Sequence, residues 1–185
     1  MRDILQGALE ALRLLYTRDP AVLEILGLTL RVSGTALLFS TLVGVPLGSL
    51  LGLKRFPGRR LLTALLYTGM GLPPVVVGLF VYLMLSRSGP LGSWGWLFTP
   101  RAMIVAQTII SFPLIAGFTM SSVLGVDPDL RRQVRSLGAT NWQVTRAVLT
   151  EARTGVVVAL VAGFGSIISE VGAVMLVGGN IDGST

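Results

Sequence analysis

The chain has 185 residues, of which 52% are hydrophobic and 13% are charged, and its mean hydropathy is +0.76. These values are typical of integral membrane proteins and exclude an ordinary soluble domain. The net charge of +6 is compatible with nucleic-acid binding, but the basic residues lie in short connections between apolar runs, so we attribute them to membrane topology. The chain has no cysteine and no histidine, which excludes disulfides, thiolate or imidazole metal sites and a histidine general base.

The sequence also lacks a nucleotide-binding signature. The only lysine, Lys54, follows Leu53, so the Gly-Lys-Ser/Thr sequence of a P-loop does not occur. If ATP drives this protein, we expect ATP and Mg²⁺ to bind to a separate chain, and we expect no cofactor in this one.

Residues 1–16 predict an amphipathic helix, in which one face is apolar and the other carries Asp3, Gln6, Glu10 and Arg13. The acidic residues exclude a cleavable signal peptide, and Pro20 ends the helix. Two interpretations stay open: the helix lies on the membrane surface, or it packs against the spans of the protein itself.

Four apolar runs are each long enough to cross a bilayer, for which a helix needs about 20 residues. We expect the spans at residues 25–53, 61–86, 102–124 and 154–178. Arg31 lies in the first turns of the first span, where it can reach the interface, and Glu170 is the one charge in the fourth. The predicted fold is an all-α integral membrane protein, a polytopic helical bundle that residues 1–185 form as a single domain.

Prolines interrupt two of these spans. Pro73 and Pro74 lie in mid-span, where each removes a backbone donor and disturbs the helix. Two interpretations stay open here: a plain kink, or an unwound point beside a translocation path. Pro113 predicts a kink in the third span.

The basic residues predict the topology. Residues 54–60 contain four Lys or Arg and residues 127–153 contain five, whereas residues 88–100 contain none and place Trp94 and Trp96 at an interface. Since positively charged loops stay inside, we place 54–60 and 127–153 in the cytoplasm. The N-terminus, the 88–100 loop and the C-terminal tail are then outside.

Residues 127–153 predict two short helices that meet at Gly138. Asp127 and Thr140 are suitable N-caps, and Pro128 suits the first position of a helix. Three apolar residues at the tip are exposed unless a partner covers them: Leu137, Ala139 and Trp142. Apolar surface rimmed by arginines favours a protein interface; the alternative is a loop that lies on anionic lipid headgroups.

This loop resembles the cytoplasmic loop of the permease subunits of binding-protein-dependent ABC importers, whose motif reads Glu-Ala-Ala, three residues and Gly. Gly138 matches the glycine, whereas Arg132, Gln133 and Val134 replace Glu-Ala-Ala, and Leu-Thr-Glu at 149–151 replaces a later Leu-Pro. In that family the two helices dock into a groove of a separate ATPase subunit. The resemblance implies these docking residues: Leu137, Gly138, Ala139, Thr140, Asn141 and Trp142.

The resemblance covers residues 25–185. The stretches LPPVVVGL at 72–79, QTIISFPL at 107–114 and ISEVGAVMLVGGNIDGST at 168–185 resemble the oxyanion branch and are most similar to its tungstate permeases. Because the family usually continues into one more span, we expect the sequence to be truncated before that span. The resemblance implies a prokaryotic inner membrane and three partners: an ATPase subunit, an extracytoplasmic substrate-binding protein and a second copy of the chain.

Glu170 is the one acidic residue inside a predicted span, and intramembrane carboxylates usually face a cavity or a partner. It therefore marks a candidate translocation path or gate, although a carboxylate is a poor ligand for an oxyanion. The alternative is a structural carboxylate bonded to nearby backbone or to Ser169. The other candidate residues of the path or gate are Ser169, Gly172, Pro73 and Pro74.

The predicted function is that of the membrane-spanning subunit of an ATP-driven oxyanion importer, with tungstate as the substrate. Molybdate, sulfate or an amino acid remain alternative substrates for the same architecture. A stand-alone ion-coupled transporter or channel would need several ionisable groups inside the spans, and a membrane enzyme would need a catalytic set that the sequence does not show.

Overall fold

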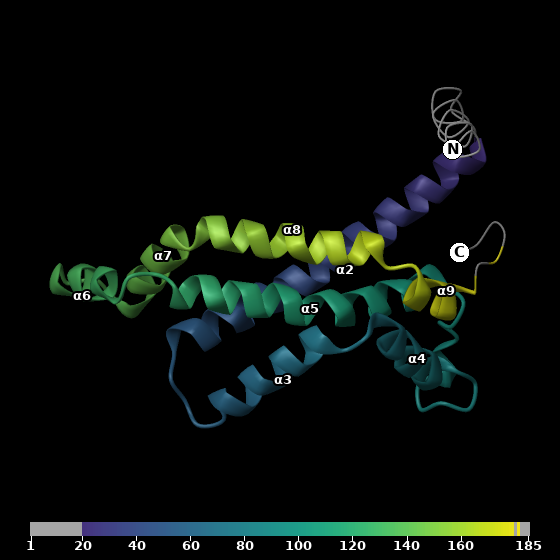
Figure 1. Cartoon of the computed structure of the whole chain (residues 1–185), viewed down its shortest axis with the longest axis horizontal. Coiled ribbons are helices and arrows are strands. Elements are labelled where there is room, and N and C mark those ends of the chain that lie inside the picture. The colour runs from purple at the N-terminus through teal and green to yellow at the C-terminus, as the bar shows by residue number, and fades with distance from the viewer. Residues whose placement is uncertain (1–19, 180, 182–185) are drawn as a thin grey trace, which may run out of the picture.

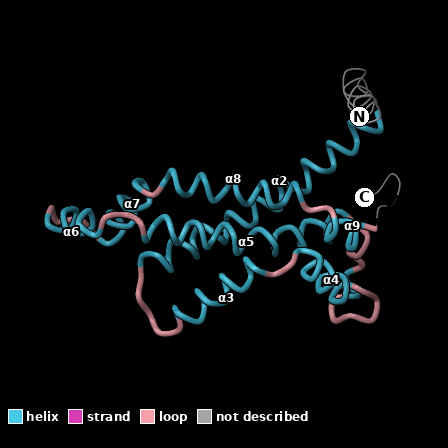
Figure 2. Tube along the Cα trace, in the orientation of Figure 1, coloured by secondary structure: helices cyan, strands magenta, loops and turns pink. Residues whose placement is uncertain are grey.

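The computed structural model describes residues 20–179 and 181, and every regular element in this part of the chain is a helix (Figure 1, Figure 2). In chain order the elements are α2 (Pro20–Leu53), α3 (Arg59–Gly71), α4 (Pro74–Leu85), the 3₁₀ turn η1 (Gly92–Trp94), α5 (Pro100–Leu124), α6 (Pro128–Ser136), α7 (Asn141–Glu151), α8 (Arg153–Ser169) and α9 (Gly172–Gly178). The predicted all-α fold is confirmed. The helix predicted for residues 1–16 lies outside the described residues.

α2 and α5 cross in close contact and form the centre of the bundle (Figure 1). Glycines on α2 permit this approach, because a Cβ atom at Gly48 would lie 2.3 Å from the carbonyl oxygen of Ala116 in α5. A Cβ atom at Gly52 would lie 2.6 Å from the side chain of Val123. Gly44, one turn before Gly48, also faces α5. Small residues at this spacing allow two membrane helices to pack with their backbones close together.

The predicted second span, residues 61–86, consists of two helices, so of the two open interpretations the plain kink is wrong and an interruption of the helix is present. α3 ends at Gly71, α4 begins at Pro74, and the two helices are bent by 102°. Pro73 has an extended backbone with ψ of 128°. Because neither proline has an N–H to donate, the helical hydrogen bonds of α3 cannot continue into α4.

The predicted fourth span, residues 154–178, is also divided. α8 ends at Ser169, Glu170 has an extended backbone with ψ of 112°, and α9 begins at Gly172. This region contains no proline, so its apolar pattern did not reveal the break. The predicted third span, by contrast, is one uninterrupted helix, since α5 continues through Pro113 to Leu124.

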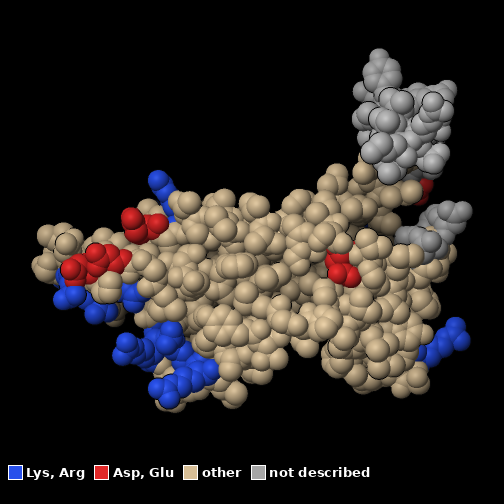
Figure 3. Space-filling view, in the orientation of Figure 1, with Lys and Arg blue, Asp and Glu red and all other residues tan. Residues whose placement is uncertain are grey.

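The two arginine-rich segments lie at the same end of the molecule (Figure 1). α6 and α7 project from this end, and the turn between α2 and α3 lies closer to the bundle. On the face shown in Figure 3, most Lys and Arg atoms gather at this end. α4, α9 and the beginning of α2 lie at the opposite end (Figure 1). This separation of charge is the arrangement that the topology prediction requires.

In the part of the chain that the structure describes, two helices are long and apolar enough to cross a membrane: α5, and α2 from Val22 to Leu53. The number rises to four if α3 with α4, and α7 with α8, each count as one bent span. Large apolar side chains are exposed along most of these helices, among them Leu42, Leu65, Phe80 and Val161. Such surfaces suit contact with lipid or with another membrane subunit.

Candidate functional site

α6 begins at a side-chain cap and is tied to the bundle by an arginine. The Asp127 carboxylate accepts the N–H of Asp129 at 2.8 Å, which confirms the predicted cap. Asp129 also pairs with Arg132. Arg131 reaches back and donates to the carbonyl oxygen of Val123, in the last turn of α5, at 3.3 Å. A cation at a helix C-terminus is stabilising, so this contact helps to fix α6 on α5.

The bend between α6 and α7 is a Schellman motif centred on Gly138. The Gly138 N–H bonds to the Arg135 carbonyl at 3.0 Å, and the Ala139 N–H bonds to the Val134 carbonyl at 3.3 Å. Gly138 has φ of +81°, in the left-handed region that favours glycine. A Cβ atom at Gly138 would find no atom within 4 Å. The backbone conformation therefore explains the glycine, and crowding within the chain does not.

α7 begins with a capping box. The Thr140 hydroxyl accepts the N–H of Gln143 at 3.4 Å, and the Gln143 side-chain oxygen accepts the N–H of Thr140 at 2.7 Å. The predicted cap at Thr140 is thus confirmed. On the inner side of α7, Val148 lies in a buried apolar cluster with Val123 of α5 and Ala152. α7 therefore packs against the end of α5 through its buried side, while the tip of the loop lies at the start of α7.

Two large apolar side chains are presented at this tip. Leu137 is 86% exposed and Trp142 is 72% exposed. Gly138, Thr140 and Asn141 are also exposed. Ala139 is half-buried, so the prediction that it is exposed is wrong; its N–H is bonded back to α6, which draws the residue toward that helix. We call residues 137–142 the docking tip. Backbone hydrogen bonds and the cap at Thr140 hold this turn in place, and it presents two large apolar side chains to solvent.

The two helix breaks meet at the other end of the molecule. A Cβ atom at Gly78 in α4 would lie 2.7 Å from the Cα of Ala173 in α9, so the two backbones are in contact. At the residue before Ala173, a Cβ atom at Gly172 would lie 3.0 Å from the side chain of Val75 in α4. The structure therefore brings the Pro73–Pro74 break next to the Glu170 break, which the sequence analysis grouped only by hypothesis.

Glu170 caps the beginning of α9. Its side-chain Oε1 accepts the N–H of Ala173 at 2.8 Å, and the residue is half-buried. The Ser169 hydroxyl does not join this bond; it donates to the carbonyls of Gly165 and Ser166 in α8. A carboxylate at the N-terminus of a helix is stabilising. The contact has the form expected of a structural carboxylate, and a role in gating stays a prediction.

Gln107 is a residue of this region that the sequence analysis missed. It lies in α5, is 4% exposed, and donates from its side-chain amide to the carbonyl of Ile167 in the last turn of α8, at 3.4 Å. Its side-chain oxygen is buried without a hydrogen-bond partner. The available signal was a lone amide side chain inside an otherwise apolar run. Among the described residues, no group of three His, Cys, Asp or Glu side chains could hold a metal ion.

Residues 44–185 match the family described as the binding-protein-dependent transport system inner membrane component. The matched region includes the α2 glycines, both helix breaks and the docking tip. The chain belongs to this family. The permease is therefore a multi-pass membrane component of a transport system, as its resemblance predicted.

Three relatives show where the permease lies within the family. It is 45% identical over 160 residues to a probable anion ABC transporter permease of Haloferax volcanii, covering 86% of this chain and 69% of the relative. It is 42% identical to a tungstate uptake system permease of Peptoclostridium acidaminophilum, covering 100% of this chain and 81% of the relative. A molybdenum transport system permease of Escherichia coli is 34% identical, over 85% of this chain and 72% of the relative.

Proposed function

We propose that the permease forms the translocation path of an ATP-driven tungstate importer and couples this path to a separate ATPase. Relatives named as tungstate uptake permeases share 42% and 31% identity over 100% and 96% of this chain. A molybdenum permease is 34% identical over 85% of the chain, and a sulfate permease is 30% identical over 78%. The high identity over the full chain is what favours tungstate over molybdate and sulfate.

The exposed docking tip is the observation that carries the coupling part of this proposal. Tryptophan and leucine side chains lose hydrophobic stabilisation when they face water, and tryptophan is enriched at the centres of protein interfaces. Leu137 and Trp142 project from a turn that two caps and a Schellman motif hold in place. A groove on the ATPase that covers residues 137–142 would bury both side chains and hold the loop on the ATPase.

The docking tip is linked mechanically to the helix breaks. α7 passes into α8 with a bend of 62° at Ala152, and α8 ends next to Glu170. In the proposed cycle, ATP binding draws the ATPase subunits together and displaces the docking tips. α8 transmits this displacement to the breaks, where Ser169, Glu170, Gly172, Pro73 and Pro74 form the gate. The close contact of α4 with α9 at Gly78 supports a gate that moves as one unit.

The proposed orientation places residues 54–60 and 127–153 in the cytoplasm and the 88–100 loop outside, together with both termini. It is supported by the basic residues that gather at one end of the molecule (Figure 3). An extracytoplasmic substrate-binding protein then delivers the anion at the end that carries α4 and α9. A second copy of the permease completes the path, and the exposed apolar side chains of the helices supply surface for that contact and for lipid.

Uptake measurements test the substrate. A strain that lacks the native permease should lose high-affinity accumulation of radiolabelled tungstate and regain it when the permease is restored with its ATPase and binding protein. Excess molybdate or sulfate should compete less well than unlabelled tungstate. If the restored strain accumulates molybdate or sulfate in preference to tungstate, the proposed substrate is wrong while the transport function stands.

A further inference from the structure

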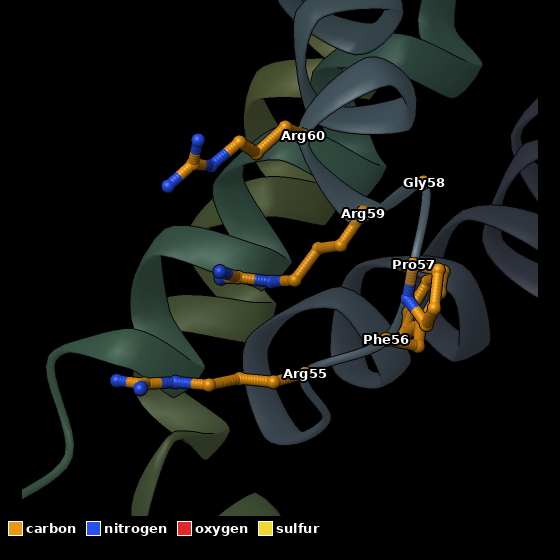
Figure 4. A pocket seen from close by; sticks show the side chains of 6 residues that line it. All are labelled: Arg55, Phe56, Pro57, Gly58, Arg59 and Arg60. Carbon is orange, nitrogen blue, oxygen red and sulfur yellow. The ribbon is translucent and has the colours of Figure 1, made fainter.

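The turn between α2 and α3 forms a basic cleft that the proposed transport cycle does not use. Residues 55–60 line this open cleft, which has a volume of about 560 Å³. Figure 4 shows the side chains of Arg55, Arg59 and Arg60 extending to the same side of the turn, while Phe56 and Pro57 lie on the other. We call this feature the arginine cleft.

No carboxylate among residues 20–179 forms an ion pair with the arginines of the cleft. Arg59 uses its Nε to donate to the carbonyl of Leu51 at 2.7 Å, which caps the end of α2 and holds the turn in place. Arg55 and Arg60 are exposed, and neither forms an ion pair with a carboxylate among the described residues. Three guanidinium groups on one side of a turn suit an anion with several oxygen atoms, because each group can donate two parallel hydrogen bonds.

The arginine cleft lies where apolar surface ends on both helices. Leu50, near the end of α2, is 39% exposed, and Leu61, at the beginning of α3, is 65% exposed. Leu65, one turn further along α3, is 58% exposed. Arginines next to a strip of exposed leucines match the boundary between lipid headgroups and acyl chains. α6 and α7 project further from the bundle than this turn does, so the docking tip and the arginine cleft lie at different levels (Figure 1).

We propose that the arginine cleft binds the phosphate group of an anionic phospholipid, whose acyl chains lie along the exposed leucines of α3. The phosphate supplies oxygen atoms that guanidinium groups on this side of the turn can bind. The exposed apolar strip favours a lipid over a free phosphate ion, because a phosphate ion has no apolar part that could contact the leucines. The level of the cleft, nearer the bundle than the docking tip, favours a lipid over the ATPase.

Lipid binding to the purified permease tests this proposal. Delipidated native permease in detergent is titrated with dioleoylphosphatidylglycerol or dioleoylphosphatidylcholine, and bound lipid is counted by native mass spectrometry. We expect phosphatidylglycerol to bind more tightly than phosphatidylcholine. Arg55→Gln combined with Arg60→Gln should weaken phosphatidylglycerol binding by about tenfold or more. Arg59 is left unchanged because it also caps α2.

Two matched variants separate this site from general charge effects. Arg132→Gln with Arg135→Gln removes the same charge from exposed positions on α6 and should leave phosphatidylglycerol binding unchanged. Arg55→Lys with Arg60→Lys keeps the charge but removes the paired guanidinium donors, so it should weaken binding less than the glutamine pair does. Folding of this variant also shows that the turn tolerates substitution. Equal loss in both glutamine pairs, or no loss in either, would overturn the proposal. Inorganic phosphate supplies the remaining comparison. If phosphate binds with a dependence on Arg55 and Arg60 that phosphatidylglycerol does not show, the cleft binds free phosphate and the lipid assignment is wrong.

Discussion

The Glu170 carboxylate accepts the N–H of Ala173 at 2.8 Å, and the backbone of Ala173 in turn lies against Gly78 of α4. One acidic side chain therefore fixes the start of α9, and α9 fixes the position of α4. Gln107 adds a second bond on the other side of the break, from α5 to the last turn of α8. These contacts join the last turn of α8 to α5, and the start of α9 to α4.

Substitutions of Glu170 separate its capping role from a role in gating. Glu170→Gln keeps an oxygen that can accept the Ala173 N–H, so we expect the complex with the ATPase to assemble normally while transport or basal ATP hydrolysis changes. Glu170→Ala removes the cap and should lower the free energy of unfolding by about 1 kcal/mol. Thermal unfolding and ATP hydrolysis of the purified complex measure the two effects. Failure of the glutamine variant to accumulate as a folded complex would leave only the structural role.

The α2–α5 contact predicts opposite outcomes for two glycines of the same helix. Gly48→Ala places a methyl group 2.3 Å from the carbonyl oxygen of Ala116, so we expect it to lower the free energy of unfolding by about 1–3 kcal/mol. A Cβ atom at Gly34 meets no atom within 4 Å, and Gly34→Ala should be neutral or raise stability by up to about 1 kcal/mol. Thermal unfolding in detergent compares them. Equal melting temperatures for both variants would contradict the close approach at Gly48.

Local signals in the sequence predicted the two short helices of residues 127–153 well. Asp127 and Thr140 were assigned as caps because a capping residue acts within its own turn, and both caps are present. Gly138 is predicted at the bend because glycine interrupts a helix, and the structure adds the reason, a φ of +81°. The family motif pointed to the same residues. Only Ala139 differs, since its burial depends on how the bend folds back on α6.

The helix breaks were predicted less well, because tertiary contacts decide them. Pro73 and Pro74 signalled a disturbance, but the 102° bend depends on where α4 packs, which periodicity does not report. At Glu170 the surrounding residues form an apolar run with no proline, and the break is stabilised by contacts with α4 and α5. Gln107 supplies one of those contacts from a distant part of the sequence. Periodicity along the chain does not report a pairing between such distant residues.

The topology can be tested because the chain has no native cysteine. Ser93 and Ser136 are both exposed, so a single cysteine at either position is accessible to reagent on its own side of the membrane. Ser93→Cys should react with an impermeant thiol reagent in intact cells. Ser136→Cys should react only after the membrane is permeabilised. The reverse labelling pattern would invert the proposed orientation.

Trp142 tests whether the docking tip supplies binding free energy. Because the side chain is 72% exposed, Trp142→Ala should hardly change the stability of the permease, whereas loss of an aromatic anchor should weaken ATPase binding by about 1–2 kcal/mol. Trp94→Ala is the control, since Trp94 is 52% exposed at the opposite end. The amount of ATPase that co-purifies with each variant gives the comparison. Equal retention by both would remove Trp142 from the interface.

Retention of the ATPase by two substitutions at Gly138 tests the central claim most directly. Asparagine and aspartate have nearly the same shape and both tolerate positive φ, and a Cβ atom at this position finds no atom within 4 Å. Only aspartate brings a charge that must be buried in the groove of the partner, at a cost of about 3 kcal/mol or more, which is over a hundredfold in affinity. With membrane insertion as the control, we predict that Gly138→Asn retains much of the ATPase in a pull-down and Gly138→Asp loses it. If Gly138→Asp retains the ATPase at the wild-type level, residues 137–142 are not the coupling element, and a loop that lies on anionic lipid becomes the better interpretation.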